Sequence, residues 1–528
     1  MFRIPSLSIF ETPEPVYGGT KSIHMRKFFI LLAVAATATT QAQKMTDPKP
    51  FANSITEEGL KKHLYVIASR DFEGRETATE GQRLAAAYIE NQFKAMGLQP
   101  GNKDHFQLYY PVFQDSLQGA RLEVDGNAYQ LYQDFDVSIS ANYPSTIMAS
   151  DIVFAGYGIT DSVQDDYKGL DVRGKVVMVL NGMPSSRLQT QINRRFFNPY
   201  GKQDAAQQHG AIAVLVVQTE FPRKAVSSKG NMYLTGYKKI NRPVTYYVSE
   251  AIARKIMGED FDHAKNGQVQ PKEYNNNLLL QFNKTTLFLQ SSDVLGYLEG
   301  SDLKDQLLVI SAHYDHLGKR DTVIYYGADD DGSGTVSVLE IAQAFAKAKA
   351  AGKGPRRSIL FLANSGEEKG LWGSEYYTDH PTYPLDKTTA DLNIDMIGRI
   401  DPKRNYGDST NYVYVVGDDK LSSDLHSISV AANKKYTKLE LDYKFNDPKD
   451  PERIYYRSDH YNFAKKGVPI IFYFDGIHND YHRPTDTPDK INYDILKKRA
   501  QLVFYTAWDM ANRDAMLERD IPLPPMGR

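Results

Sequence analysis

The stretch QLLVISAHYD, from Gln306 to Asp315, indicates the fold of this chain. It is a short apolar run, rich in Leu, Val and Ile, that ends in a histidine and an aspartate. Continuous apolar runs of this length are typical of strands that are buried on both faces of a sheet. The stretch therefore predicts a central strand, with further strands beside it and helices on both sides.

Three similar runs follow, and helical segments separate them. The strand-like sequences are Ser358-ILFLAN, Ala390-DLNIDM and Pro469-IIFYF, and helices are expected near 333–351 and 492–513. Alternation of strands and helices is typical of an α/β sheet that helices cover on both faces. We therefore expect a mixed-sheet α/β/α domain that begins near residue 50, with helices between 56 and 97.

Residues from about 105 to 290 have a different sequence pattern. Short β-type runs such as Asp151-IVFA and Lys175-VVMVL are broken there by Gly, Asn and Pro. This pattern predicts a smaller, β-rich domain inserted into the α/β domain. We assign 44–115 and 289–515 to the α/β domain, 116–288 to the insert and 516–528 to a C-terminal tail.

Composition excludes several classes of function. The 528-residue chain has a formal net charge of −2, which gives no general attraction to nucleic acid or to anionic membranes. It contains no cysteine, so disulfides, thiol catalysis and Cys-ligated zinc are excluded. Any metal site must therefore be built from His, Asp and Glu.

The N-terminal region has the features of an export signal. Arg26 and Lys27 follow Met25 and precede the apolar run from Phe28 to Ala36, which is too short to span a bilayer. A cleavage site with small residues ends at Ala42. We expect a signal peptide at 25–42 within a leader of residues 1–43, with translation starting at Met1 or Met25. The mature protein should be soluble, without stable membrane insertion, and periplasmic or extracellular.

Histidines and carboxylates cluster where the predicted strands end. His313 and Asp315 close the first strand, Glu367 and Glu368 follow the second, and Asp395 closes the third. Each has an ordinary structural explanation when it is taken alone, such as a buried hydrogen-bonded histidine or an acidic helix start. Ligands of open α/β sheets bind beyond the carboxyl ends of the strands, so together these residues predict one site.

Two divalent ions about 3.5–4 Å apart can hold an attacking water and a scissile carbonyl. Such a site needs a bridging carboxylate, further His or carboxylate ligands, and a nearby glutamate that is not a ligand and takes a proton from water. The adjacent Glu367 and Glu368 can supply one ligand and one base. Asp315, two residues after His313, is placed to orient that histidine.

Five motifs together resemble the M28 family of zinc peptidases over roughly 55–115 and 290–510. They are His313-Tyr-Asp315, Gly327-ADDDGS-Gly334, Glu367-Glu368, Asn393-IDMI-Gly398 and Tyr481-HRPTD-Thr487. The resemblance implies two Zn²⁺ ions, for which Co²⁺ or Mn²⁺ could substitute. It implies Asp330 as the bridging ligand, with a cis peptide after it, His313 and Asp395 on one ion, and Glu368 and His482 on the other. Glu367 would be the general base, and Tyr481 would hold the oxyanion.

The insert resembles a protease-associated (PA) domain, through Val153-FAGYGI and the segment from Asp166 to Val177. The family resemblance implies an aminopeptidase that removes N-terminal residues from peptides. A carboxypeptidase or dipeptidase on acidic peptides and a glutaminyl cyclase are alternatives, although Tyr481 and the insert disfavour the cyclase. A non-catalytic peptide-binding protein is a more remote one. The sequence leaves the residue preference at the scissile bond and the oligomeric state open.

Overall fold

The computed structural model describes residues 46–184, 194–224, 227–236 and 242–523. Residues 47–528 cluster as one compact unit. The predicted signal peptide at 25–42 lies outside the described residues, as do the last five residues of the predicted tail. None of the helices in the described ranges has both the length and the apolarity that crossing a bilayer requires.

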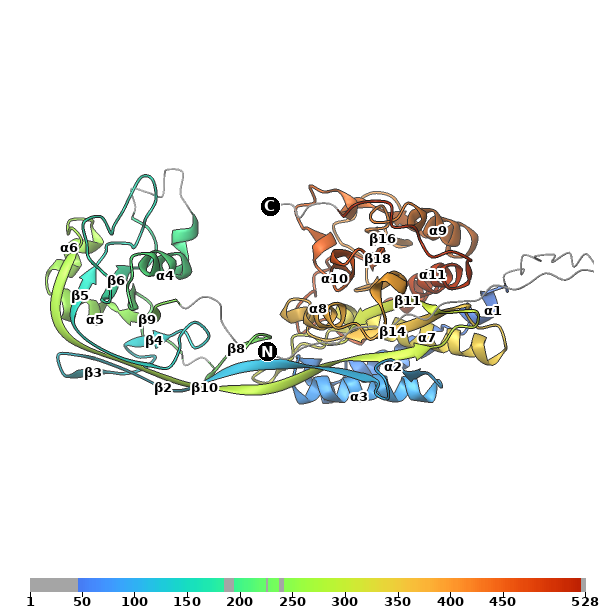
Figure 1. Cartoon of the computed structure of the whole chain (residues 1–528), viewed down its shortest axis with the longest axis horizontal. Helices are drawn as coiled ribbons and strands as arrows, with labels where there is room; N and C mark the ends of the chain where they lie inside the picture. Colours follow the sequence, from blue (N-terminus) through green and yellow to red (C-terminus); the bar gives the residue numbers. More distant parts are fainter. Residues whose placement is uncertain (1–45, 185–193, 225–226, 237–241, 524–528) are drawn as a thin grey trace, which may run out of the picture. The chain divides into compact units, whose positions relative to one another are not determined.

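The predicted mixed α/β fold is confirmed, and its sheet has the order β17-β16-β18-β15-β11-β14-β10. Figure 1 labels strands β10, β11, β14, β16 and β18 of this part of the sheet. β11 runs parallel to both β14 and β15, and β15 runs parallel to β18. β10 and β16 make the antiparallel pairings, with β14 and β18 respectively. The bounds are β10 (Lys272–Leu298), β11 (Leu303–His313), β14 (Arg357–Asn364), β15 (Thr388–Ile394), β16 (Tyr412–Val416), β17 (Glu440–Asp442) and β18 (Ile470–Phe474).

Alternate residues of the central strand enter two different cores. Leu308 and Ile310 of β11 belong to one hydrophobic cluster, whereas Leu307 and Val309 belong to another. This alternation follows from the two-residue period of a strand, and it explains why the run is apolar throughout. Helices of the first cluster are α2 (Glu57–Ile67), α3 (Glu80–Ala95), α7 (Gly334–Ala350), α9 (Asp424–Ala432) and α11 (Tyr493–Asn512), and those of the second are α8 (Trp372–Asp379) and α10 (His460–Lys465).

Local signals set the ends of these helices. Thr56 accepts a hydrogen bond from the Gly59 amide at the start of α2, and Asn492 accepts one from Ile495 at the start of α11. Gly97, just beyond α3, has a φ of +77°, the left-handed conformation that is common where helices end. The helices predicted at 333–351 and 492–513 are therefore present within one residue at each end.

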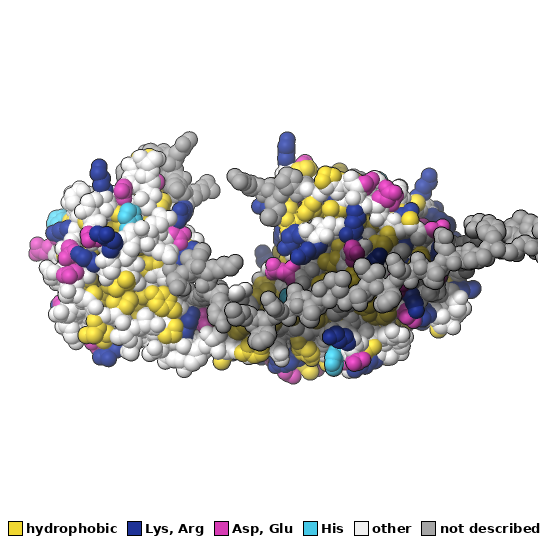
Figure 2. Space-filling view, in the orientation of Figure 1, with side chains coloured by type: hydrophobic (Ala, Val, Ile, Leu, Met, Phe, Trp, Pro, Cys, Tyr) yellow, Lys and Arg dark blue, Asp and Glu magenta, His cyan; other side chains and the backbone are white. Residues whose placement is uncertain are grey.

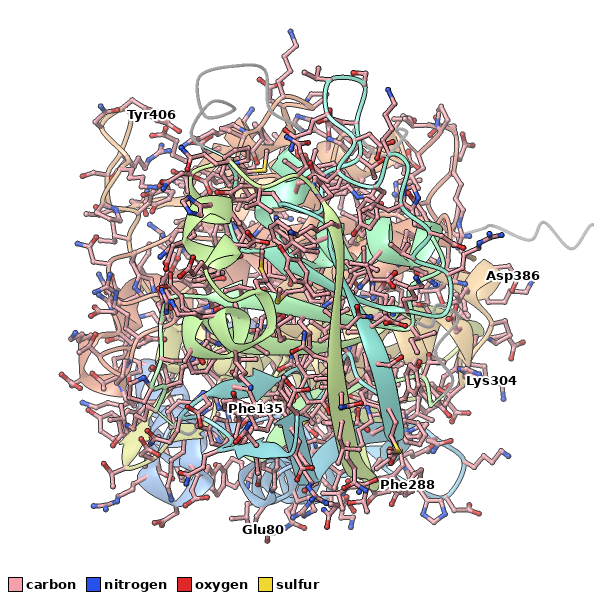
Figure 3. All side chains as sticks on the ribbon, turned by 90° about the vertical axis from the view of Figure 1, so that its left-hand side faces the viewer. Glu80, Phe135, Phe288, Lys304, Asp386 and Tyr406 are labelled. Carbon is pink, nitrogen blue, oxygen red and sulfur yellow. The ribbon has the colours of Figure 1, made fainter. Side chains whose placement is uncertain are left out.

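Two strands are much longer than the short runs that the sequence suggests. β2 (Gln107–Val124) pairs with β10 in antiparallel register from Gln107 to Val124, with a bulge at Asn283/Lys284. Phe288, labelled in Figure 3, is 63% exposed midway along this ribbon. Because the middle of this ribbon is exposed on both faces, it has no clear hydrophobic period that would reveal its length. The domain boundaries assigned at 115/116 and 288/289 fall inside these two strands.

The insert contains a parallel sheet with helices. β5 (Ser145–Phe154), β6 (Val176–Leu180), β7 (Ala213–Gln218) and β9 (Val244–Ser249) run parallel in that order. The segment predicted to be β-rich therefore has α/β character, because α4 (Pro199–Gln208), α5 (Glu250–Met257) and α6 (Asp260–Lys265) also belong to it. Smaller elements are α1 (Lys49–Ala52), β1 (Gln99–Pro100), β3 (Asn127–Tyr129), β4 (Phe135–Val137), β8 (Lys229–Tyr233), β12 (Lys319–Arg320) and β13 (Val323–Ile324).

Charged side chains of both signs are interspersed on the face shown in Figure 2. This mixture agrees with the formal net charge of −2. The visible surface therefore offers no broad patch of a single charge, and the chemistry has to be sought in the interior.

Candidate metal centre and active site

The structure brings the predicted site residues together at the carboxyl edge of the sheet. β11 ends at His313, β14 leads into Glu367 and Glu368, and β15 leads into Asp395. The segment after β18 supplies Tyr481 and His482. Parallel strands end at the same edge of a sheet, which is why residues far apart in sequence meet here.

Asp330 lies between two groups of residues, one on each side of its carboxylate. Its Oδ1 is 3.3 Å from His313 Nε2, and its Oδ2 is 3.0 Å from His482 Nε2. On the first side, His313 Nε2 is also 3.7 Å from Asp395 Oδ1. On the second side, His482 Nε2 is 3.2 Å from Glu368 Oε2. A carboxylate placed in this way can contact two ions at once.

His316 is a site residue that sequence reasoning missed. It is fully buried, and its Nδ1 lies 2.8 Å from Glu368 Oε1 and 3.8 Å from Asp330 Oδ2. By distance, two sets of ligand atoms can each hold an ion: His313, Glu367 and Asp395, and His316, Asp330 and Glu368. Both His316 and His482 therefore face the second position. The signal in the sequence was a second histidine three residues after His313.

The loop that carries Asp330 is held from several directions. Gly327 opens it in a left-handed conformation with a φ of +55°, where a Cβ would lie 2.3 Å from the Asp330 carbonyl oxygen. Asp486 Oδ2 accepts hydrogen bonds from the amides of Asp329 and Asp330. The peptide bond between Asp330 and Asp331 is cis, as the family resemblance implies. Asp331 Oδ1 accepts from the Gly334 amide, which ties the loop to the start of α7.

Asp315 contacts His313 in a different way from the one expected. The His313 Nδ1 atom lies 3.1 Å from the Asp315 carbonyl oxygen, whereas the carboxylate Oδ1 is 3.7 Å away. The Asp315 carboxylate instead accepts hydrogen bonds from Thr77 Oγ1, at 2.7 Å, and from the Glu367 amide, at 3.2 Å. Asp315 therefore orients His313 through its backbone and holds the glutamate loop through its side chain.

The electrostatics separate the two adjacent glutamates. Burial raises the pKa of Glu367 well above its usual value, and the neighbouring Glu368 carboxylate adds to this. Burial and the Asp330 carboxylate also raise the pKa of Glu368, but contacts with His316 and His482 outweigh them and lower it to about 2. Glu368 is thus the more strongly ionised of the pair, and Glu367 is the one that more readily holds a proton.

Histidine and carboxylate charges compensate one another around Asp330. Burial raises the pKa of Asp330, but His313 and His482 outweigh it and keep this pKa well below its usual value. Burial lowers the pKa of His482, whereas Asp330 and Glu368 raise it, to about 10 in total. The side chains therefore favour a positive charge in their midst, which protons or metal ions can supply.

Several buried atoms of this centre face an oppositely charged atom but make no regular hydrogen bond with any described residue. They are His313 Nε2, His316 Nδ1, Asp330 Oδ2 and Glu368 Oε1. Buried polar atoms are rarely left in this state unless a water or an ion completes them. Nitrogen and oxygen donors of this kind are those that zinc prefers, so the residues present fit a metal centre.

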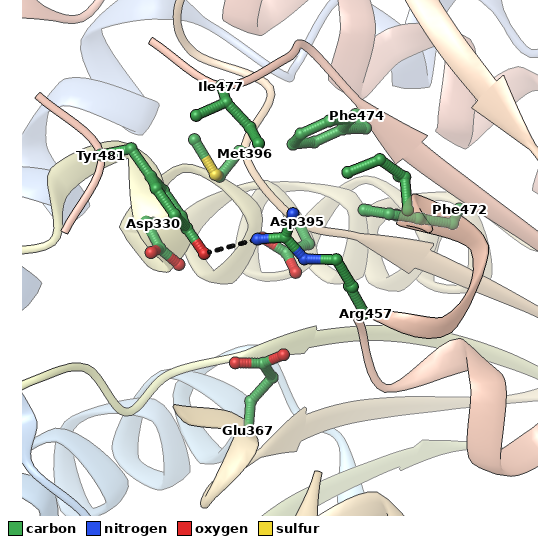
Figure 4. A pocket seen from close by; sticks show the side chains of 10 residues that line it. Asp330, Glu367, Asp395, Met396, Arg457, Phe472, Phe474, Ile477 and Tyr481 are labelled. Carbon is green, nitrogen blue, oxygen red and sulfur yellow. Dashed lines mark hydrogen bonds between the residues drawn. The ribbon is translucent and has the colours of Figure 1, made fainter. Parts of the chain in front are cut away.

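A pocket that polar and apolar residues line in equal number adjoins the carboxylates (Figure 4). Tyr481 lies on one side, with its ring stacked on His482 at 3.9 Å, and Glu367 lies on the opposite side. Arg457 Nη2 donates a hydrogen bond of 3.2 Å to the Tyr481 hydroxyl. Burial raises the pKa of Tyr481, so its hydroxyl keeps its proton. Apolar lining residues are Met396, Ile454, Phe472, Phe474 and Ile477.

Fold and site together define a mixed α/β protein with a buried His–carboxylate metal centre at the edge of its sheet. The sequence profile of Peptidase family M28 matches residues 293–507, which contain all the predicted metal-centre residues. Over this region, which is less than half of the chain, the sequence is similar to peptidase family M28.

One curated relative and two solved structures are similar to this chain, the structures in fold alone. A probable leucine aminopeptidase of Trichophyton verrucosum is 29% identical over 214 residues, which are 39% of this chain and 55% of the relative. The chain thus spans about half the length of that relative. The aminopeptidase from Aneurinibacillus sp. strain AM-1 has a TM-score of 0.53 at 17% identity, covering 91% of this chain and 99% of that one. The zinc aminopeptidase BSAP from Bacillus subtilis has a TM-score of 0.51 at 19% identity, with coverages of 89% and 99%. These two structures share the fold well beyond the matched region.

Proposed function

We propose that the protein is an exported aminopeptidase that uses two zinc ions. The observation that carries this proposal is the position of Asp330, whose two carboxylate oxygens face His313 on one side and His482 on the other. A one-ion site would have no use for a buried carboxylate with a histidine at each oxygen. In this proposal His313 and Asp395 hold the first ion, Glu368 and His482 hold the second, and Asp330 is shared.

The chemistry that bound zinc supplies is Lewis-acid polarisation of the scissile carbonyl and a lowered pKa of the attacking water. Glu367 accepts the proton of that water, because its carboxylate lies in the pocket on the side opposite Tyr481. The same carboxyl group then returns the proton to the departing amine. Tyr481, which keeps its hydroxyl proton, donates a hydrogen bond to the developing oxyanion.

The pocket walls favour an apolar side chain at the N-terminus of the substrate. Five apolar residues line the pocket beside the carboxylates, and four of them, Met396, Ile454, Phe472 and Phe474, are almost fully buried. Desolvating a Leu-sized side chain in such a pocket is worth roughly 1.5–3 kcal/mol, which is enough to rank substrates. The name of the Trichophyton verrucosum relative, a probable leucine aminopeptidase, supports this preference.

Export rests on the segment from Met25 to Ala42, which has the charged, apolar and small-residue regions of a signal peptide. The absence of cysteine accords with a periplasmic or extracellular location, since no thiol is exposed to oxidation there. In this proposal the partner of the mature chain is a peptide with a free amino terminus.

A substrate panel with metal quantified on the same sample tests the proposal. Zinc-loaded mature protein should release free amino acids from leucyl and phenylalanyl peptides faster than from lysyl peptides, and it should not cleave the same peptides when they are N-acetylated. Two zinc equivalents per chain should accompany full activity. Equal cleavage of N-acetylated and free peptides would contradict an aminopeptidase, and full activity with one equivalent would contradict the shared role of Asp330.

One observation favours a second candidate, a carboxypeptidase on acidic peptides. Arg457 is a cation on the pocket wall, with its side chain 37% exposed, and could bind a substrate carboxylate. N-blocked peptides that end in glutamate form the arm of the panel that tests this candidate. An arm with N-terminal glutamine detects cyclisation, the third activity that the sequence leaves open.

A further inference from the structure

A buried arginine that is not among the predicted catalytic residues hydrogen-bonds the backbone next to the candidate metal ligands. Arg75 is fully buried, and its guanidinium donates four hydrogen bonds, all to backbone carbonyls. Nε donates to Tyr314 at 2.6 Å, and Nη2 donates to Gly327 at 2.9 Å. Nη1 donates to Ile67 and Tyr326, both at 2.8 Å. The arginine thus joins three segments that are more than 200 residues apart at their extremes.

Two of those segments carry the metal-centre residues. Tyr314 directly follows His313 at the end of β11. Gly327 is the left-handed residue that opens the loop to Asp330. One planar guanidinium therefore fixes the distance between the backbone that presents His313 and the backbone that presents Asp330. Its fork of rigidly placed N–H groups suits this task better than a single ammonium would.

The two residues after Arg75 contact other parts of the same centre. Thr77 Oγ1 donates a 2.7 Å hydrogen bond to Asp315 Oδ2, and Asp315 in turn accepts from the Glu367 amide. Glu76 pairs with the His316 backbone in a β-bridge, and its carboxylate accepts a 2.8 Å hydrogen bond from Lys369. Three consecutive residues thus reach the His313, Asp330 and Glu367 segments.

Placing an arginine here is costly for the fold. Burial lowers the pKa of Arg75 to about 10, although Asp315, Asp330 and Asp486 act in the opposite direction. The residue also has a φ of +53°, a left-handed conformation that side chains other than glycine rarely adopt. Within the described residues, none of its hydrogen bonds goes to a carboxylate, so ion pairing does not account for it. The role of Arg75 must therefore come from the four backbone carbonyls to which it donates.

We propose that Arg75 is a positioning residue, which holds the backbone segments of His313 and Asp330 at the separation that metal binding requires. Glu76 and Thr77 hold neighbouring parts of the centre in the same way, through their contacts with His316 and Asp315. The inference rests on the metal centre of the proposed function, but it concerns the order of these loops before any metal is bound.

Arg75→Gly in the full-length mature protein tests the proposal. Glycine accepts the left-handed backbone, so the variant removes the side chain without adding backbone strain. Zinc affinity, measured by competition with a chromophoric chelator, should fall about 10–100-fold, as is usual for outer partners of metal ligands. In metal-free protein, the amides of 314–316 and 327–332 should exchange hydrogen faster than in the parent. Guanidinium at millimolar concentration should restore part of the affinity, whereas sodium chloride at equal ionic strength should not.

Arg357 supplies the matched control. It is also fully buried, donates to Gln306 Oε1 and to the Met510 carbonyl, and has its pKa lowered to about 10 by burial. It lies at the start of β14, the end of that strand farthest from the glutamates. Arg357→Ala should lower the melting temperature but leave zinc affinity and the exchange of the two loops unchanged.

Unchanged zinc affinity and unchanged loop exchange in Arg75→Gly would overturn the inference, as would an equal loss of affinity in Arg357→Ala. Should Arg75→Gly fail to fold, Arg75→Lys keeps the charge but cannot hold all four carbonyls, and it should show the same two effects. A parent chain that takes up no zinc would refute the proposed function, whereas the role of Arg75 is still decided by loop exchange in the metal-free protein.

Discussion

The α/β domain and the insert both contain parallel strands with helices, yet they differ in how completely their buried charged groups are hydrogen-bonded. In the insert, Asp166 accepts hydrogen bonds from the amides of Tyr157 and Ile159 and from the Gln164 side chain. Lys202, also buried, donates to the carbonyls of Tyr157 and Gly182. These two charges are satisfied by nearby backbone.

In the α/β domain, the buried charges at the sheet edge are left incomplete. Asp330 is 3% exposed, close to the 8% of Asp166, but its Oδ2 and the facing atoms of His313, His316 and Glu368 lack hydrogen-bond partners. Burying charged groups with incomplete hydrogen bonding is expensive, so a site that retains them is organised around something else that binds there. The difference teaches that architecture alone does not locate function in this chain, whereas incompletely paired buried charge does.

The comparison predicts its largest effect at Asp330. Asp330→Ala should reduce zinc from two equivalents per chain to less than one, because both ions lose a ligand. Peptidase activity should then fall to the background of the uncatalysed reaction. Elemental analysis of the purified variant and a leucyl-nitroanilide assay measure both quantities. A variant that retains two equivalents would show that the carboxylate does not bridge.

Glu367→Gln should affect catalysis but not metal content. The amide keeps the size of the side chain but cannot accept the proton of the attacking water, so kcat should fall by about 10²–10⁴-fold. Zinc should stay at the parent stoichiometry. Glu368→Gln is the matched variant, and it should lose one zinc equivalent. The reverse pattern would mean that the roles of the two glutamates have been exchanged.

Much of this centre could be predicted from sequence because local patterns carry it. The apolar runs before His313 and Asp395 reveal strands, and strands of a parallel sheet end at one edge. The position of the Asp329–Asp331 run before a helix was equally readable. Only the pattern and the known geometry of α/β sheets are needed to place those residues near one another.

The rest depends on contacts that no local pattern records. Arg457 reaches the pocket from a short irregular segment, and Arg75 reaches the centre from the N-terminal helices. His316 lies just beyond a strand, and the sequence pattern does not distinguish it from a buried structural histidine. Both faces of the β2/β10 ribbon are exposed in its middle. The sequence there has no hydrophobic period from which the strand length could be predicted.

Substitutions of the two histidines near Glu368, His316 and His482, should differ in their effect on zinc binding. His482→Ala should lose the second zinc, since a ligand is removed. His316→Asn should keep two zinc ions at saturation but bind the second about 10–100-fold more weakly, because in the proposed ligand set His482 binds the ion and His316 supports Glu368. Stepwise titration with a chelator separates the two ions. Loss of the second ion in His316→Asn alone would make His316 the ligand.

The smallest effect is expected in the insert, where an equally buried aspartate has a purely structural role. Asp166→Ala removes the acceptor of two backbone amides and should lower the free energy of unfolding by about 1–3 kcal/mol. Zinc stoichiometry and kcat should stay at the parent values, because the partners of Asp166 are all within the insert. Lys168→Ala, at an exposed position two residues further on, should change stability by less than about 0.5 kcal/mol. Urea denaturation with zinc quantified in parallel measures both, and loss of zinc in Asp166→Ala would show that the insert supports the metal centre after all.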